Sequence, residues 1–322
     1  MIQLLLLLSL AVGTEASLGE PVPDVRFGEM LNGDGRTRLA EFRGQPVVVL
    51  QWTHTSDNCL QYAIPKAREL ARRTEDGLVV ILQETEFQET VDLQAFVLRE
   101  LPGLDVRCCR LVQDLPVRWT GETGQPCFAV IGADGTLAAE GLLWTRGKQL
   151  DDAVKEEMKR LKKGFGESKA ARAVRSRLFG PKADLAAALA AADGAGDERD
   201  ALRSEIERCF EARVAVVRHL VDGGRSSRAR RELDELASAA SGVPAWESPL
   251  ADLEATLSTA EFAADLAWEK KLDALTRPFA SKRPKPQHGE RLRKLAEEAA
   301  GSRVASRADA LAEAVERATR ED

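Results

Sequence analysis

The first half of the chain alternates short apolar runs with a segment of helical periodicity. VVVLQW (residues 47–52), LVVILQ (78–83) and CFAVIG (127–132) are apolar at successive positions, which predicts strands buried on both faces of a sheet. Residues 64–77 have helical spacing and end at a glycine. They predict a crossover helix between the first two strands, which makes these two strands parallel.

A turn and a long helix complete the first half. The sequence ADG at residues 133–135 predicts a tight turn that joins the third strand to TLAAEGLLW as a hairpin. The helix that follows places four apolar residues on one face and ends in lysines and a glycine. These four residues are Leu150, Val154, Met158 and Leu161. The pattern predicts an α/β domain, in which helices flank a mixed sheet.

The second half, residues 167–322, has only helical periodicity, which predicts an all-α domain. ELDELASAASG and RLRKLAEEAAG resemble two copies of a tetratricopeptide-like helical hairpin, although chance similarity between Ala-rich helices explains the match equally well. The copies superpose Leu233 on Leu292, Leu236 on Leu295, Ala237 on Ala296, Ala240 on Ala299 and Gly242 on Gly301. Three prolines within residues 277–289 predict a linker between them.

The amino-terminal residues 1–16 have the plan of a signal peptide, with an apolar core followed by small residues. The apolar run is too short to span a bilayer, so we expect a periplasmic or secreted protein with no stable membrane anchor after cleavage. The chain has 46 basic and 52 acidic residues, a formal charge of −6. This charge argues against nucleic acid as a partner.

Three motifs occur in order in the first half: LAEFRGQPVVVLQW, a cysteine at a helix start, and GQPCFAVIGADGTL. Together they resemble the exported thioredoxin-like proteins of the redoxin and TlpA kind, over residues 21–163. The resemblance implies a thioredoxin-like domain and a thiol-disulfide oxidoreductase ancestry. It also implies that Pro126 is a cis-proline whose loop lies against the cysteine site.

The cysteine motif departs from that family. Counting from Trp52, the position of the first cysteine holds Ser56 and the position of the second holds Cys59. A thiol at the first turn of a helix is favoured as thiolate and attacks a disulfide, and the second thiol resolves the mixed disulfide. A serine hydroxyl does not ionise near neutral pH, so the two-thiol cycle lacks its nucleophile.

Three interpretations of this degenerate Ser-x-x-Cys are open. In the first, the domain binds without turnover. In the second, Cys59 is itself reactive, because Ser-x-x-Cys resembles the peroxiredoxin motif. That family also has an arginine near the thiol, and Arg118 is available for this role. The family has a proline at the position where this chain has Trp52. In the third, Cys59 pairs with Cys127 beside Pro126, although strand alternation turns Cys127 away from the site.

The remaining cysteines and histidines predict packing rather than chemistry. Cys108 and Cys109 lie in a predicted strand, one inward and one outward, and Cys209 lies on an apolar helix face. His54 is the histidine next to the predicted site, where it is either a proton shuttle or an ordinary loop residue. His219 lies near a predicted helix end, and His288 lies in the predicted linker. No ligand set for a metal or cofactor is evident.

We therefore expect a binding or scaffold protein that has lost dithiol turnover and that binds a protein or peptide through its helical domain. The alternative is a thiol-dependent enzyme, either a monothiol peroxidase or a disulfide-exchange protein, that uses Cys59. The pairing of the five cysteines and the oligomeric state are open.

Overall fold

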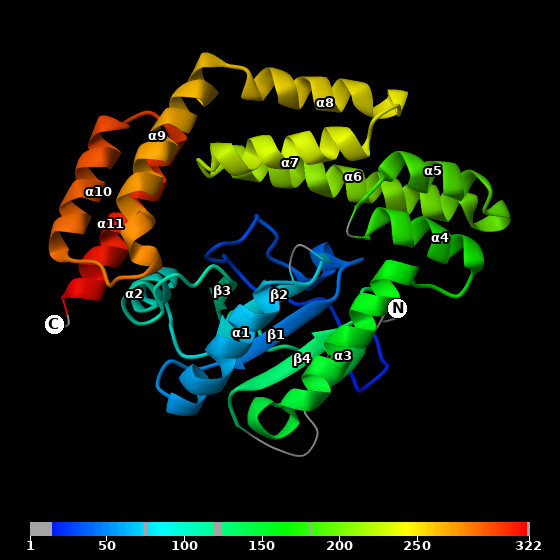
Figure 1. Cartoon of the computed structure of the whole chain (residues 1–322), viewed down its shortest axis with the longest axis horizontal. Helices are drawn as coiled ribbons and strands as arrows, with labels where there is room; N and C mark the ends of the chain where they lie inside the picture. Colours follow the sequence, from blue (N-terminus) through cyan, green and yellow to red (C-terminus); the bar gives the residue numbers. More distant parts are fainter. Residues whose placement is uncertain (1–14, 74–75, 119–123, 181, 321–322) are drawn as a thin grey trace, which may run out of the picture.

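The computed structural model describes residues 15–73, 76–118, 124–180 and 182–320. The amino-terminal half contains a five-stranded sheet with the order β3-β2-β1-β4-β5 (Figure 1). Its strands are β1 (Val47–Trp52), β2 (Val79–Glu84), β3 (Arg107–Arg110), β4 (Cys127–Ile131) and β5 (Leu137–Leu142). The three predicted apolar runs are strands, as expected.

The sheet is mixed. Strand β1 pairs with β2 in parallel and with β4 antiparallel, while β2 and β3 are parallel and β4 and β5 antiparallel. Helices α1 (Ile64–Ala71), α2 (Thr90–Glu100) and α3 (Leu143–Lys163) accompany it. A parallel β1-α1-β2 unit beside an antiparallel β4-β5 hairpin is the thioredoxin-like arrangement, which confirms the predicted fold class.

The two faces of the sheet are covered differently. Side chains of α1, α2 and α3 pack on the face formed by Val48, Leu50 and Trp52. Residues 16–42, which have little regular structure, pack on the face formed by Val47 and Val49. Both faces of the sheet are therefore shielded from water, which explains why every residue of β1, β2 and β4 is buried.

Cys108 and Cys109 correct one prediction. They lie in β3 on opposite faces of the sheet, as strand alternation requires, but both are fully buried. Neither is the outward, exposed cysteine that was expected, because the amino-terminal segment covers the second face. The backbone of Leu31 in that segment forms a bridge with Cys108.

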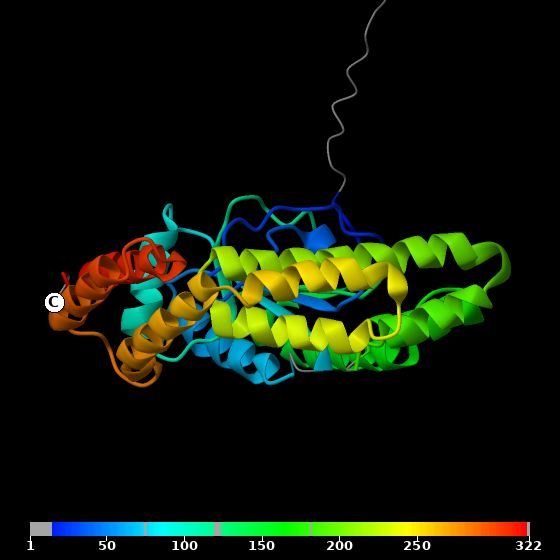
Figure 2. The ribbon, with the colours of Figure 1, turned by 90° about the horizontal axis from the view of Figure 1, so that it is seen from above.

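The carboxyl-terminal half is all-helical, as predicted, and contributes a second core. It forms an arch whose first helices follow α3 and whose last helices lie against α2 (Figures 1 and 2). Its helices are α4 (Lys169–Leu178), α5 (Leu185–Asp193), α6 (Arg199–Asp222), α7 (Ser226–Ala239), α8 (Pro244–Leu257), α9 (Ala260–Thr276), α10 (Pro286–Glu298) and α11 (Arg303–Thr319). No described helix is long and apolar enough to cross a membrane.

The distal end of the arch is fixed to α2 by apolar and ionic contacts. Leu98 of α2 packs on the core formed by α9, α10 and α11. Arg317 Nη1 lies 2.6 Å from Asp92 Oδ1 and 2.9 Å from Glu89 Oε2, and Arg283 Nη2 lies 2.6 Å from Glu100 Oε2. The helical half is therefore held against the sheet domain at both of its ends.

Three predicted boundaries are wrong. The helix expected over residues 64–77 ends at Ala71, where turns replace it. The second strand of the hairpin stops at Leu142, and Leu143 already begins α3. The predicted linker at residues 277–289 contains a short 3-10 helix and the first turn of α10. Prolines are tolerated at the first helical positions, and two of the three prolines, Pro278 and Pro286, each lie within the first two residues of a helix.

The two segments that resemble copies have matching environments. Leu233 and Leu292 are both buried, and Gly242 and Gly301 both have positive φ, at 79° and 86°. The predicted signal peptide, residues 1–16, lies almost wholly outside the described residues. Its last residue, Ala16, is buried and its N–H donates to the Pro116 carbonyl oxygen, so packing on the sheet begins before the expected boundary at residue 21.

Candidate functional site

The candidate site begins where β1 ends. Residues 53–56 form the turn into the next helix, and the Ser56 N–H donates to the Thr53 carbonyl oxygen at 3.4 Å. Cys59 is the first residue of a π-helical turn, Cys59–Ala63, that precedes α1. A π-turn inserts one extra residue per turn. It places the Cys59 side chain inward, where its exposed fraction is 0%.

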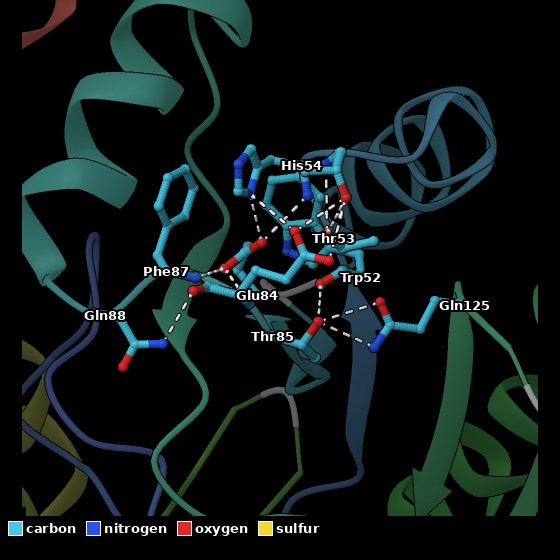
Figure 3. Close-up of polar contacts among 10 residues, drawn as sticks. Trp52, Thr53, His54, Glu84, Thr85, Phe87, Gln88 and Gln125 are labelled. Atoms are coloured by element: carbon cyan, nitrogen blue, oxygen red, sulfur yellow. Dashed lines mark hydrogen bonds and ion pairs between the residues drawn. The ribbon is translucent and has the colours of Figure 1, made fainter.

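Pro126 lies on the other side of this site, at the start of β4. The Gln125–Pro126 peptide bond is cis and Pro126 is buried. Thr85 Oγ1 lies 3.0 Å from Gln125 Nε2 and 3.2 Å from Gln125 Oε1 (Figure 3). The Thr85 N–H donates to the Trp52 carbonyl oxygen at 3.0 Å. The proline loop is thus connected to the ends of β2 and β1, next to the turn that carries Ser56.

A buried carboxylate lies at the end of β2. Glu84 has an exposed fraction of 0% and faces His54, which follows β1 (Figure 3). Glu84 Oε1 accepts from the His54 N–H at 3.1 Å and lies 2.9 Å from His54 Nδ1. Glu84 Oε1 is the acceptor in this contact when Nδ1 carries the ring proton. The His54 ring is held in place by stacking on Phe87, with centroids 4.0 Å apart and planes at 11°.

The loop after β2 closes over the same carboxylate. Glu84 Oε2 accepts from the N–H groups of Glu86 and Phe87 at 2.9 and 2.7 Å. Glu86 is exposed and its carboxylate accepts from Thr55 Oγ1 at 2.9 Å. Hydrogen bonds from the Thr53 and Thr55 hydroxyls lower the pKa of Glu86. Glu84 therefore joins the two loops that follow β1 and β2.

His54, Glu84 and Glu86 together could hold a metal ion, because one ligand atom of each lies within 4.8 Å of the others. Glu84, however, accepts two hydrogen bonds at each oxygen, which fills the lone pairs that an ion would need. The arrangement is that of a hydrogen-bond network rather than an open coordination site.

The surroundings of Cys59 oppose its ionisation. Burial raises the pKa of the Cys59 thiol, hydrogen bonds with the Thr53 backbone and the Ser56 hydroxyl partly offset this, and the charges of Glu84 and Glu86 raise it again. A thiol with a raised pKa holds little thiolate at neutral pH, and thiolate is the nucleophile. The Ser56 hydroxyl lies beside Cys59 and hydrogen-bonds with it.

Cys127 belongs to the opposite face of the sheet. It pairs with Gln51 across β1 and β4, and its thiol is 3.5 Å from Gln51 Oε1. The Gln51 side chain donates in turn to Gln83 Oε1 at 2.9 Å. Burial raises the pKa of Cys127 to about 12. All five cysteines are free thiols, so the structure does not contain the Cys59–Cys127 pair of the third interpretation.

The other predicted residues lie apart from the site. Arg118 is exposed and its backbone N–H donates to Ala16, on the face of the sheet opposite Cys59. His219 in α6 lies over Gly35, and Cys209 is partly exposed at a cleft between the two halves. His288 is not in a linker: it lies in the first turn of α10, and its Nδ1 accepts from the Lys285 N–H.

Glu84, Thr85 and Glu86 were not among the predicted site residues. They follow the second apolar run directly, as His54 follows the first. Polar residues at the carboxyl ends of two adjacent parallel strands meet at one edge of the sheet, where α/β proteins commonly bind ligands. That signal was present in the sequence and would have placed Glu84 beside His54.

The chain matches no protein-family profile and no curated protein. Among solved structures it is similar to the thioredoxin domain of a thiol-disulfide oxidoreductase from Bacteroides vulgatus, with 19% identity over 44% of this chain and 96% of that chain and a TM-score of 0.35. It is also similar to a thiol:disulfide interchange protein of the thioredoxin family from Chlorobium tepidum TLS (15% identity, 44% and 98% coverage, TM-score 0.35). A third similar structure is a thiol-disulfide isomerase from Corynebacterium glutamicum, with 16% identity over 41% of this chain and 95% of that chain and a TM-score of 0.33. Each similarity covers less than half of this chain.

Proposed function

We propose that this chain is a thioredoxin-fold binding protein of the redoxin and TlpA kind that does not catalyse dithiol-disulfide exchange. The proposal rests on one observation: Cys59 is fully buried and has the Ser56 hydroxyl, not a second sulfur, beside it. Exchange needs a thiolate that attacks and a second thiol that resolves the mixed disulfide. A single buried thiol with a raised pKa supplies neither.

The rival function, a monothiol enzyme that uses Cys59, requires an accessible thiolate. The charges of Glu84 and Glu86 disfavour that thiolate, and Arg118 lies on the opposite face of the sheet rather than beside the thiol. We further propose that the helical half contributes the surface that recognises a protein or peptide partner. The signal-like residues 1–16 support a location outside the cytoplasm.

The test is reduction of insulin by the purified protein in the presence of a dithiol reductant. We expect the wild type to give no rate above the reductant alone. Ser56→Cys places a thiol beside Cys59 and is expected to gain disulfide reductase activity, which the double variant Ser56→Cys with Cys59→Ser loses again. Insulin reduction by the wild type that Cys59→Ser abolishes would show that the thiol is catalytic, and the proposal would be wrong.

Peroxidase activity is tested in the same way. Consumption of hydrogen peroxide by the reduced wild type, absent from Cys59→Ser, would establish the monothiol enzyme. Equal and negligible rates in both proteins support the binding function.

A further inference from the structure

A cleft of about 1650 Å³ separates the helical arch from the sheet domain. On one side it is lined by residues just before β1, β2 and β3, namely Gln45, Gly77 and Asp105. On the other side lie α6 and α7 (Figure 1). The cleft is therefore at the amino ends of the parallel strands, whereas Ser56 and Cys59 follow the carboxyl end of β1. It is a separate site from the thiol.

Two arginines of the sheet domain converge in this cleft on a single carboxylate. Arg36 Nη2 lies 2.6 Å and Arg107 Nη2 lies 3.0 Å from Asp34 Oδ2. Asp34 is buried, with an exposed fraction of 3%. One buried carboxylate thus shares its charge between two guanidinium groups.

Two arginines from the helical half approach the same loop. Arg225 Nη1 and Arg228 Nη1 donate to the carbonyl oxygen of Gly33 at 2.9 and 3.2 Å. A carbonyl oxygen carries no formal charge. The carboxylate nearest to Arg228, that of Glu232, is 3.9 Å from its Nε, beyond hydrogen-bond distance. Four guanidinium groups therefore surround a loop that contributes one negative charge.

Two donors in this cluster have no acceptor among the described residues. The Nε atoms of Arg107 and Arg228 are buried and make no hydrogen bond. Buried polar groups are nearly always paired, so these two donors favour an incoming acceptor. Burial and the neighbouring guanidinium groups lower the pKa of Arg225, and burial lowers that of Arg107, as expected where positive charges crowd together.

Further arginines line the cleft, together with carboxylates such as Glu205 and Asp234. Arg213 of α6 and Arg231 of α7 both line it, and within the described residues neither forms an ion pair. Guanidinium groups bind carboxylates through two parallel N–H donors, a geometry that a point charge does not reproduce. The cleft is larger than a typical small-molecule pocket, which has a volume of roughly 300–1,000 Å³. It is also held open by an arch that is fixed at both ends.

We propose that this arginine cluster binds the carboxylate side chains of an acidic peptide segment of a partner protein. The proposal rests on the proposed binding function and names its surface and the chemistry of its partner. Carboxylates also line the cleft, among them Glu232 and Glu235 of α7, and their repulsion directs an acidic segment to the arginines around Gly33 and Asp34.

The test is fluorescence anisotropy of fluorescein-labelled oligoglutamate, with oligolysine of equal length as the opposite-charge control and the full chain as the receptor. The variant Arg213→Glu with Arg231→Glu replaces two cleft arginines that form no ion pair within the described residues. We expect it to weaken oligoglutamate binding by about tenfold or more, and we expect wild-type binding to weaken as NaCl rises from about 50 to about 300 mM. Arg291→Glu, an exposed arginine of α10 that does not line the cleft, is the matched control and keeps wild-type binding.

Three results would overturn the inference: no binding of oligoglutamate, equal binding by the cleft variant and the Arg291→Glu control, or displacement of the peptide by inorganic phosphate at equal concentration. The last result would identify a site for free oxyanions instead of a peptide. None of them bears on the insulin assay, so failure of the cleft proposal and failure of the proposed function are distinguishable. Circular dichroism of each variant confirms that it is folded.

Discussion

Glu84 is the residue on which the geometry of the candidate site depends. Its fully buried carboxyl group lies at the edge of the sheet and accepts four hydrogen bonds from His54, Glu86 and Phe87. A buried carboxylate is stable only when its lone pairs are satisfied in this way. The two loops that frame Ser56 and Pro126 are therefore fixed by one side chain that is not itself exposed to a ligand.

Replacing Glu84 tests this role. Glu84→Gln keeps the size of the side chain but exchanges one accepting oxygen for an amide donor, which leaves two N–H groups facing another donor. We expect a loss of about 3 kcal/mol in the free energy of unfolding, measured by urea denaturation. Glu86→Gln, at an exposed carboxylate of the same loop, is the control and leaves the midpoint nearly unchanged. Equal effects of the two substitutions would contradict the role assigned to Glu84.

The cysteines give a second prediction at this scale. Cys209 is the one cysteine that is not buried, and burial of most of its surface raises its pKa to about 11. Below that pKa the thiolate fraction rises tenfold with each pH unit. We expect iodoacetamide to label native protein at Cys209, slowly at pH 7 and tenfold faster for each unit of pH, as read by peptide mass spectrometry. Faster labelling at Cys59 than at Cys209 would show that the thiol of the site is accessible.

Among the secondary-structure elements, the junction between α3 and α4 determines where the helical half begins. Gly164 ends α3 with φ at 77°, a conformation that glycine adopts without strain, and the chain then turns into α4. A Cβ atom at this position would collide with the carbonyl oxygen of Arg172 in α4. The close approach of the two helices thus requires a residue without a side chain.

We expect Gly164→Ala to lower the free energy of unfolding by about 3 kcal/mol, from the unfavourable φ and the backbone clash together. Gly301→Ala provides the comparison: its φ is 86°, but a Cβ atom there meets nothing within 4 Å. In Gly301→Ala the free energy of unfolding therefore falls only by the cost of the unfavourable φ, about 1 kcal/mol. Thermal and urea denaturation of both proteins measure the difference. If both variants lose the same amount, the contact between α3 and α4 does not constrain Gly164.

The elements also show how far the sequence alone could lead. The strands were predictable because a strand buried on both faces is apolar at every position, and Ser56 could be placed by counting from Trp52. The segment 16–42 could not be predicted to cover the sheet, because it lacks periodicity and its packing is set by the tertiary fold. For the same reason one of Cys108 and Cys109 was expected to point outward. The network around Glu84 joins residues 30 positions apart, so only the parallel pairing of β1 and β2 reveals it.

For the molecule as a whole, the docking of the two halves sets what the chain can bind. The helical arch lies over the amino ends of the parallel strands and leaves the site at their carboxyl ends uncovered (Figure 1). The arginine cluster exists only because Arg225 and Arg228 of one half meet Gly33 of the other. The positions of these arginines in the sequence do not indicate it, since Arg225 and Arg228 lie 192 and 195 positions from Gly33.

Asp34 provides a test of this docking through the dependence of stability on pH. Burial favours the neutral form of Asp34, but hydrogen bonds and charges of Arg36 and Arg107 outweigh it and hold its pKa well below the ordinary value. A carboxyl group with a depressed folded-state pKa contributes stability that is fully present above its unfolded pKa, near 3.9, and is lost as the pH falls below that value. Asp34→Asn removes this contribution and leaves Arg107 buried without a carboxylate. We expect it to cost about 3 kcal/mol at pH 7.

The cost of Asp34→Asn is expected to shrink as the pH falls from about 4 towards 2, because the unfolded wild-type chain then binds a proton at Asp34 that folding must release. Urea denaturation at neutral and acidic pH measures both quantities. Asp105→Asn, which removes an exposed carboxylate of the same cleft, is the control and leaves stability within about 0.5 kcal/mol of wild type at each pH. Hydrogen exchange locates the effect: faster exchange in α6 and α7 of Asp34→Asn indicates that the loop holds the helical half in place. A cost that is independent of pH would mean that Asp34 is not the carboxylate that the arginines stabilise.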